Sequence, residues 1–130
     1  MKMKFIAVAA MTAAAFFSVG RAYAHHSFAA TYYVDQVITI KGTVTEFLFR
    51  NPHSFLKVQA PDDKGQMQVW AIEWAGGVQL SQANVAKDTL KPGDLVEVSG
   101  NPGRNPAEHR IRIKSISRSS DGFKWEGIIQ

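Results

Sequence analysis

The chain has 130 residues, no cysteine and a formal net charge of +4. The lack of cysteine excludes disulfides, thiolate metal sites and thiol redox chemistry. Three of the 15 basic residues, Lys2, Lys4 and Arg21, lie in the first 24 positions, so 12 basic residues face 11 acidic ones in the rest. This near balance argues against a general polyanion binder, and no nucleic-acid partner is expected.

Residues 1–24 have the pattern of a signal peptide. Lys2 and Lys4 precede an apolar run at 5–19, and Ala22-Tyr23-Ala24 supplies small residues at the two positions that signal peptidase reads. The run is too short for a membrane span. We therefore expect cleavage after Ala24 and a periplasmic or secreted protein whose first residues are His25 and His26.

After a lead-in at residues 25–36, period-two alternation predicts a strand from Val37 to about residue 50. Its alternation slips at Glu46, and the strand also contains Gly42, which together predict a bulge or sharp bend. Asn51-Pro52 ends the strand. Further strands are predicted at about 53–60, 66–74, 95–100 and 109–116, and a short last strand is a candidate within 117–130.

The connections are also readable. Residues 61–65 predict a hairpin turn with Gly65 at a positive φ, and residues 91–94 predict a type II turn. A short helix is predicted at 78–87. Three strands, a helix and two strands are the order of an OB fold, so we expect a mainly β protein with a five-stranded OB-fold-like barrel over residues 37–130. The alternative is another small antiparallel barrel or sandwich in which 78–90 is only loop.

Several short motifs recur in one known group of proteins. They are His25-His26-Ser27-Phe28-Ala29, Asn51-Pro52-His53, Trp70 with Glu73, and Leu90-Lys91-Pro92-Gly93-Asp94. With these motifs the chain resembles an uncharacterised family of small bacterial secreted proteins that begin, after the signal, with His-His-Ser-Phe-Ala. The resemblance implies export and a small barrel, and it implies no activity.

The processed N-terminus is a candidate metal site. A chain that begins at His25 offers its α-amine and its ring as neighbouring nitrogen ligands for copper or zinc. His26 and His53 are the next candidate ligands, Glu73 is the most plausible carboxylate, and His109 is a weaker candidate. The competing interpretation is that the terminal histidines serve only solubility and processing, and that Glu73 pairs with an arginine.

A second candidate is a basic and aromatic strand face. Alternation places Lys41, Phe55, Lys57, Arg110 and Arg112 on one outer surface. OB folds hold oligonucleotides or oligosaccharides on such surfaces, and export favours a glycan or an acidic protein partner. The competing interpretation is an ordinary solvated face.

No nucleophile or phosphate-binding motif of a known enzyme class occurs in the sequence. We therefore expect a non-catalytic binding or accessory protein. The lead hypothesis is a metal site at the processed N-terminus, and the alternative is ligand binding by the strand face.

Overall fold

The computed structural model describes residues 28–129, which include six strands, a short helical segment at residues 28–31, a second short α-helix and one 3-10 helix. The strands are β1 Ile38–Leu48, β2 Phe55–Pro61, β3 Met67–Glu73, β4 Leu95–Pro102, β5 Arg110–Arg118 and β6 Phe123–Glu126. The helix α2 is Gly77–Gln82, and the 3-10 helix η1 is Pro106–Glu108.

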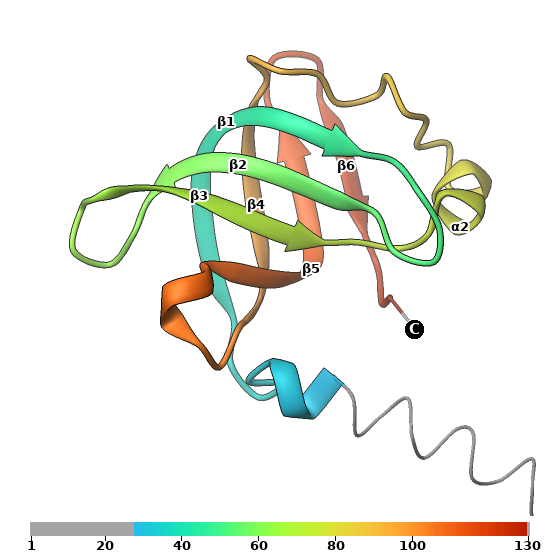
Figure 1. Ribbon diagram of the computed structural model, residues 1–130. Coiled ribbons are helices and arrows are strands. Elements are labelled where there is room, and N and C mark those ends of the chain that lie inside the picture. The colour runs from blue at the N-terminus through green and yellow to red at the C-terminus, as the bar shows by residue number, and fades with distance from the viewer. Residues whose placement is uncertain (1–27, 130) are drawn as a thin grey trace, which may run out of the picture. The chain divides into compact units, whose positions relative to one another are not determined.

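Five of the strands close into a barrel (Figure 1). The sheet order is β3-β2-β1-β4-β5-β6, and β3 also pairs with β5, in parallel, through residues 71–73 and 110–112. This order, with a short helix between β3 and β4, is that of an OB-like barrel and confirms the predicted fold class. The last strand, β6, pairs with residues 115–118 of β5, so it extends the sheet beyond the barrel.

The predicted bend in the first strand is present. The pairing of β1 with β2 shifts between Val44 and Glu46, so Thr45 is the extra residue of a bulge. Gly42 lies earlier in the strand, where a Cβ would come 2.0 Å from the carbonyl oxygen of Gln59. Only glycine allows this close approach of two backbones, and the approach helps β1 to curve between β2 and β4.

The barrel is filled by inward-facing strand residues and by α2. The largest fully buried side chains are Trp74, Tyr32, Leu56, Ile72, Leu80, Leu90, Ile111, Ile113, Ile116, Ile129, Val44 and Val58. Trp70, Ile72 and Trp74 are all buried, as the alternation in β3 predicts. Glu73 is also buried, although the same alternation places it on the outer face.

Both predicted glycine turns are confirmed. Gly65 has a φ of 77° and Gly93 a φ of 95°, in the left-handed region that glycine adopts at no steric cost. In the second turn the amide of Asp94 donates to the carbonyl of Lys91 at 3.1 Å, which closes the hydrogen bond typical of a β-turn.

The helix α2 ends at Gln82 rather than at the predicted residue 87. Asn84 adopts a left-handed φ of 59°, and the amide of Val85 donates to the carbonyl of Leu80 at 2.9 Å. This is a Schellman ending, which asparagine accommodates better than most residues. Within residues 28–129 no helix is long and apolar enough to cross a membrane.

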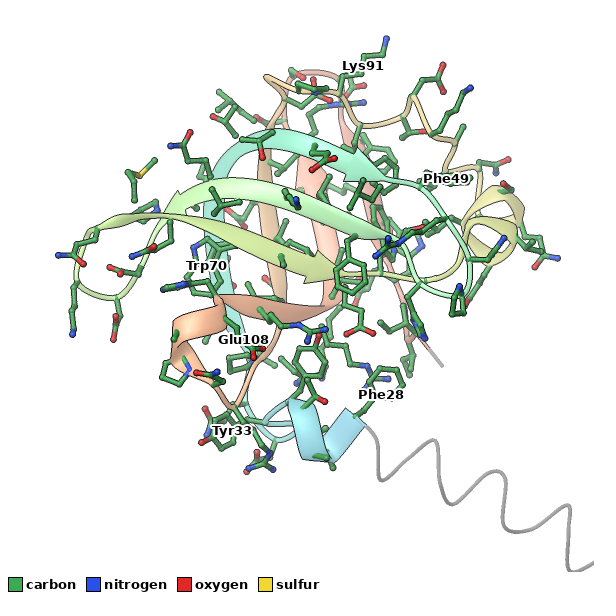
Figure 2. The ribbon with its side chains drawn as sticks, viewed as in Figure 1. Phe28, Tyr33, Phe49, Trp70, Lys91 and Glu108 are labelled. Carbon is green, nitrogen blue, oxygen red and sulfur yellow. The ribbon has the colours of Figure 1, made fainter. Side chains whose placement is uncertain are left out.

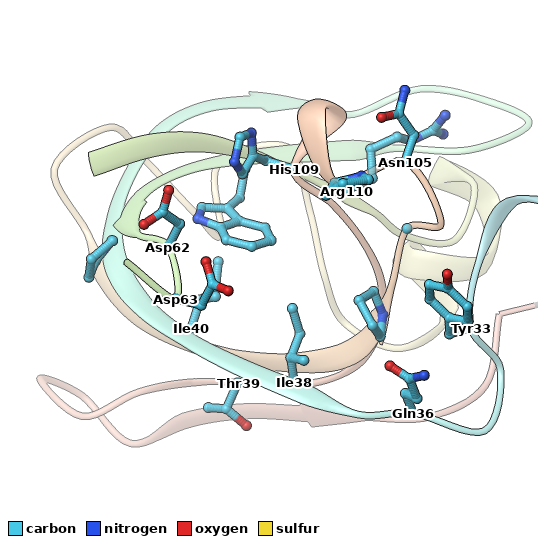
Figure 3. Close-up of a pocket in the computed structure, with 15 residues that line it drawn as sticks. Tyr33, Gln36, Ile38, Thr39, Ile40, Asp62, Asp63, Asn105, His109 and Arg110 are labelled. Atoms are coloured by element: carbon cyan, nitrogen blue, oxygen red, sulfur yellow. The ribbon is translucent and has the colours of Figure 1, made fainter. Parts of the chain in front are cut away.

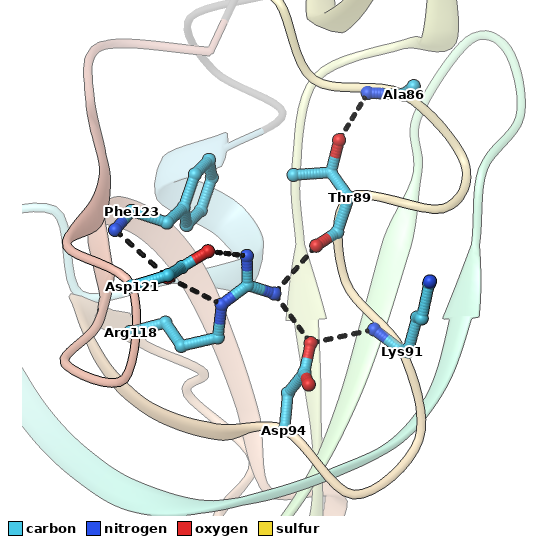
Figure 4. A network of polar contacts seen from close by, with 7 residues as sticks. All are labelled: Ala86, Thr89, Lys91, Asp94, Arg118, Asp121 and Phe123. Atoms are coloured by element: carbon cyan, nitrogen blue, oxygen red, sulfur yellow. Dashed lines mark hydrogen bonds and ion pairs between the residues drawn. The ribbon is translucent and has the colours of Figure 1, made fainter.

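The end of β5 is fixed by a polar network around Arg118 (Figure 4). Its guanidinium donates to Asp94 at 2.6 Å, to Asp121 at 2.7 and 3.0 Å, and to the carbonyl of Thr89 at 2.7 Å. These partners belong to the segment before β4 and to the turn after β5, so one side chain joins three parts of the chain.

Candidate functional site

The candidate site lies on the outer face of β2, β3 and β5. Cross-strand pairing sets Phe55 opposite Glu73 and Glu73 opposite Arg112. The next row contains Lys57, Ala71 and Arg110. Residues that are directly opposite each other point to the same face, so these side chains share one surface outside the core.

Glu73 is the centre of this surface. Its side chain is only 11% exposed. The Tyr32 hydroxyl donates a short hydrogen bond to Oε2, and Nη2 of Arg110 lies 3.3 Å from the same oxygen. Nδ1 of His53 is 3.7 Å from Oε1, the other carboxylate oxygen. A buried carboxylate needs such partners, because an unpaired charge is costly away from water.

Tyr32 reaches Glu73 because the lead-in is tied to the loop between β4 and β5. The amide of Tyr33 donates to the carbonyl of Pro102 at 2.9 Å, and the amide of Arg104 donates to the carbonyl of Thr31 at 2.8 Å. The two segments therefore run side by side, and Figure 2 labels Tyr33 on the first of them. The backbone thus holds Tyr32, which is 1% exposed, against the barrel.

The environment of Tyr32 changes its acidity. Burial raises the pKa of its phenol above the ordinary value, and the hydrogen bond to Glu73 raises it further. The phenol therefore stays protonated and remains a hydrogen-bond donor to Glu73 at neutral pH.

Two arginines surround the carboxylate with different partners. The guanidinium of Arg110 lies over the rings of Tyr32, at 5.6 Å, and Phe55, at 5.7 Å. Arg112 donates a short hydrogen bond to the carbonyl of Ile129. Burial lowers the pKa of the Arg112 guanidinium, and the nearby Glu73 carboxylate opposes this shift.

His53 is held by its neighbour Ser54. The amide of Ser54 donates to the carbonyl of Ala75 at 3.1 Å, and its carbonyl accepts from the amide of Trp74 at 2.8 Å. This pairing fixes the backbone beside His53, whose side chain is 30% exposed. Its Nδ1 is buried on the Glu73 side, so the accessible part of the ring lies on its other atoms.

The predicted metal-site residues are only partly brought together. His53 and Glu73 are neighbours, whereas His109 packs edge-on against Trp70 with ring centroids 5.2 Å apart. His25 and His26 lie outside the described residues. Within residues 28–129, no group of three or more His, Cys, Asp or Glu side chains is placed to hold a metal ion.

Four of the five residues predicted for the strand face lie on the outer surface described above: Phe55, Lys57, Arg110 and Arg112. Lys41 lies opposite Glu97 on β4, away from them. Lys57 is 2.9 Å from Glu46, and Arg110 approaches both Glu73 and Glu108. Carboxylates of the chain itself thus neutralise much of the charge on this face.

Sequence reasoning missed Tyr32, the residue that covers Glu73. The lead-in has no hydrophobic period to mark it. The only available signal was Glu73 itself, a carboxylate in a mostly apolar strand, which indicates that a partner must come from elsewhere.

Residues 10–112 match the model of a family of unknown function (DUF6152), so the chain belongs to that family. This agrees with the resemblance to an uncharacterised family. No curated protein and no solved structure matches the chain significantly.

Proposed function

We propose that this member of a family of unknown function is an exported, non-catalytic accessory protein that binds copper or zinc at its processed N-terminus. The ligands would be the α-amine and ring of His25, with the rings of His26 and His53. One observation carries the proposal: Tyr32, which follows the two histidines closely in sequence, shares the Glu73 carboxylate with His53.

The distance along the chain supports this assignment. Seven positions separate His25 from Tyr32. Residues 28–31 are helical and rise about 1.5 Å each, and the remaining three residues add at most about 11 Å when extended, so the reach of the segment is at most about 17 Å. Tyr32 and His53 contact the two oxygens of a single carboxylate, so His53 lies beside the residue that directly follows this helix, and we propose that the segment places His25 within reach of its ring.

The surroundings of His53 also suit a ligand. Metal-bound histidines commonly direct their second ring nitrogen to a carboxylate, which sets the orientation of the ring. Nδ1 of His53 faces Oε1 of Glu73 at 3.7 Å, and Nε2 is the ring atom that we assign to the metal. Because Tyr32 and Arg110 occupy Oε2, we assign Glu73 an orienting role rather than a place among the ligands.

The proton chemistry is favourable near neutrality. An α-amine titrates near pH 8 and an imidazole near pH 6.5, so a metal displaces these protons at modest cost at about pH 7. Binding should weaken as the pH falls below about 6, because protons then compete with the metal for imidazole nitrogens.

The test is a calorimetric titration of copper and of zinc into protein processed to begin at His25, compared with the same protein carrying three additional N-terminal glycines. A single glycine is avoided because it would place His26 third in the chain, where it could form a different chelate with the new amine. The three glycines move the amine away from the ring of His25 and leave no histidine in the first three positions, so we expect one-to-one binding to weaken by at least about tenfold. Equal affinity in the two proteins would contradict the terminal chelate.

A second comparison tests His53. His53→Gln should weaken binding by about tenfold or more, because a ring ligand is lost. The matched control is His109→Gln, since His109 packs on Trp70 and is not in the proposed ligand set. If the two variants bind alike, His53 is not a ligand.

The alternative function is a module that binds a glycan or an acidic protein partner through the strand face. The common orientation of Phe55, Lys57, Arg110 and Arg112 favours it. The ion pairs of Lys57 and Arg110 count against it. Face binding should be insensitive to the three added glycines and should fall in Lys57→Ala or Arg112→Ala, so the extended protein and these two variants together separate the two functions.

A further inference from the structure

A cleft of about 480 Å³ opens between the start of β1, the β2–β3 hairpin and the loop before β5 (Figure 3). Its volume falls in the range of small-molecule sites. Of the side chains that surround Glu73 in the candidate site, only Arg110 also lines this cleft. The cleft is therefore a separate feature of the fold.

The cleft has apolar lining from Ile38, Ile40 and Trp70, of which Ile40 and Trp70 are nearly buried. Nε1 of Trp70 already donates to the carbonyl of Ala60 at 3.2 Å. The carbon surface of the indole is thus what Trp70 offers to an occupant. Three prolines complete the apolar part of the lining: Pro61, Pro102 and Pro106.

The rim of the cleft is acidic. Asp62 and Asp63 line it from the hairpin, and Asp62 is held there by the amides of Lys64 and Gln66, each 2.9 Å from its Oδ1. Among the described residues that line the cleft, the basic ones are Arg110 and His109, and no lysine lines it.

The guanidinium of Arg110 is paired with carboxylates that do not line the cleft. It lies 3.3 Å from Glu73 and 3.8 Å from Glu108. With Arg110 paired to carboxylates and His109 packed edge-on against Trp70, Asp62 and Asp63 are the acidic side chains that an occupant of the cleft would meet at the rim. They do not form a metal site, because no suitable group of three ligands occurs in residues 28–129.

We propose that this cleft binds a small organic amine, with its apolar body on Ile38, Ile40 and Trp70 and its ammonium group at the Asp62–Asp63 rim. An ammonium ion makes charge-assisted hydrogen bonds to carboxylates and is attracted to the face of an indole ring. An anion would meet the two aspartates, and a neutral ligand would leave their charge unused. This inference does not depend on the metal-binding proposal.

The experiment uses the exported protein labelled with ¹⁵N and two probes of the same shape, benzylamine and benzyl alcohol. Benzylamine should shift the amide signals of Ile40 and Asp63 and the indole N–H signal of Trp70. Benzyl alcohol should bind more weakly. Added salt should weaken benzylamine binding, since the attraction is ionic.

Asp63→Asn tests the rim, because Asp63 is exposed and its loss should not disturb the fold. We expect benzylamine to bind about threefold more weakly to this variant. The matched control is Asp88→Asn, which removes the same charge from an exposed position outside the cleft and should leave binding unchanged.

Three results would overturn the proposal. One is benzyl alcohol binding as tightly as benzylamine. Another is a set of shifted signals that lies away from the cleft. The third is equal benzylamine affinity in Asp63→Asn and Asp88→Asn.

Discussion

Arg110 and Arg118 lie at the two ends of β5. Both pair with carboxylates, but the two arrangements differ. Arg118, at the end of the strand, donates four hydrogen bonds to Asp94, Asp121 and Thr89 (Figure 4). Arg110, at the start, contacts Glu73 and also the rings of Tyr32 and Phe55. The first arrangement uses most of the donors of a guanidinium to join turns, as a structural cross-link does.

The two clusters also differ in burial. Asp121, which pairs with Arg118, has a side chain that is 54% exposed, whereas the side chain of Glu73 is 11% exposed. Exposed pairs contribute little to stability, while breaking a buried pair leaves an uncompensated charge. The cluster around Glu73 should therefore be the more sensitive to substitution, and its histidine and phenol add chemistry that the other cluster lacks.

The largest effect is expected from Glu73→Gln. This change keeps the shape of the side chain but removes the charge that Arg110 and Tyr32 contact. We expect the free energy of unfolding to fall by about 2–4 kcal/mol. Asp94→Asn, the corresponding change beside Arg118, should cost less than about 2 kcal/mol. Urea denaturation followed by tryptophan fluorescence measures both, and equal losses would contradict the distinction between the clusters.

A smaller effect is expected from Tyr32→Phe. The variant keeps the ring beneath Arg110 and removes only the hydroxyl that donates to Glu73. A hydrogen bond to a charged group contributes about 1.5–3 kcal/mol, so a loss of that size is expected in the same denaturation assay. Tyr33→Phe is the matched control and should change stability by less than about 0.5 kcal/mol. Indistinguishable variants would show that the hydroxyl of Tyr32 is not an important contact.

The Arg118 cluster should appear most clearly in the dependence of stability on pH. The hydrogen bond from Arg118 lowers the pKa of Asp121 from 3.8 to about 2. Because the pKa is lower in the folded state, the stabilisation is complete above the unfolded value of 3.8 and is lost as the pH falls through about 2.

Asp121→Asn should therefore reduce the fall in unfolding free energy between pH 3.8 and about 2. Denaturation curves across this range measure the slope. Asp63→Asn, at an exposed position on the β2–β3 hairpin that has no part in the Arg118 network, is the control and should keep the slope of the unmodified protein. A slope that is the same in Asp121→Asn would show that this pair does not form in solution.

Local patterns were sufficient to predict much of the barrel. The slip at Glu46 marked the bulge, and Gly65 and Gly93 marked two turns, because each depends on neighbours in sequence. The helix is shorter than predicted because Asn84 adopts a left-handed conformation that ends it.

The site was harder to predict because its contacts join distant parts of the chain. His53 and Glu73 could be singled out as candidate residues, and their proximity follows from strand pairing. Tyr32 could not, because its position depends on hydrogen bonds between the lead-in and residues 102–104. The ion pairs of Lys57 with Glu46 and of Arg110 with Glu73 could likewise not be predicted from the alternation of residues along each strand.

The parallel pairing of β3 with β5 has a consequence for folding. It is the shortest ladder of the barrel, and it joins residues 71–73 to residues 110–112. Pairings between distant segments pay loop-closure entropy first and tend to form late. Tyr32 stabilises the pairing of β3 with β5, because its hydroxyl donates to Glu73 on β3 and Arg110 on β5 lies over its ring. Closing the barrel and docking the lead-in should therefore belong to one late cooperative step, and local opening should release both together.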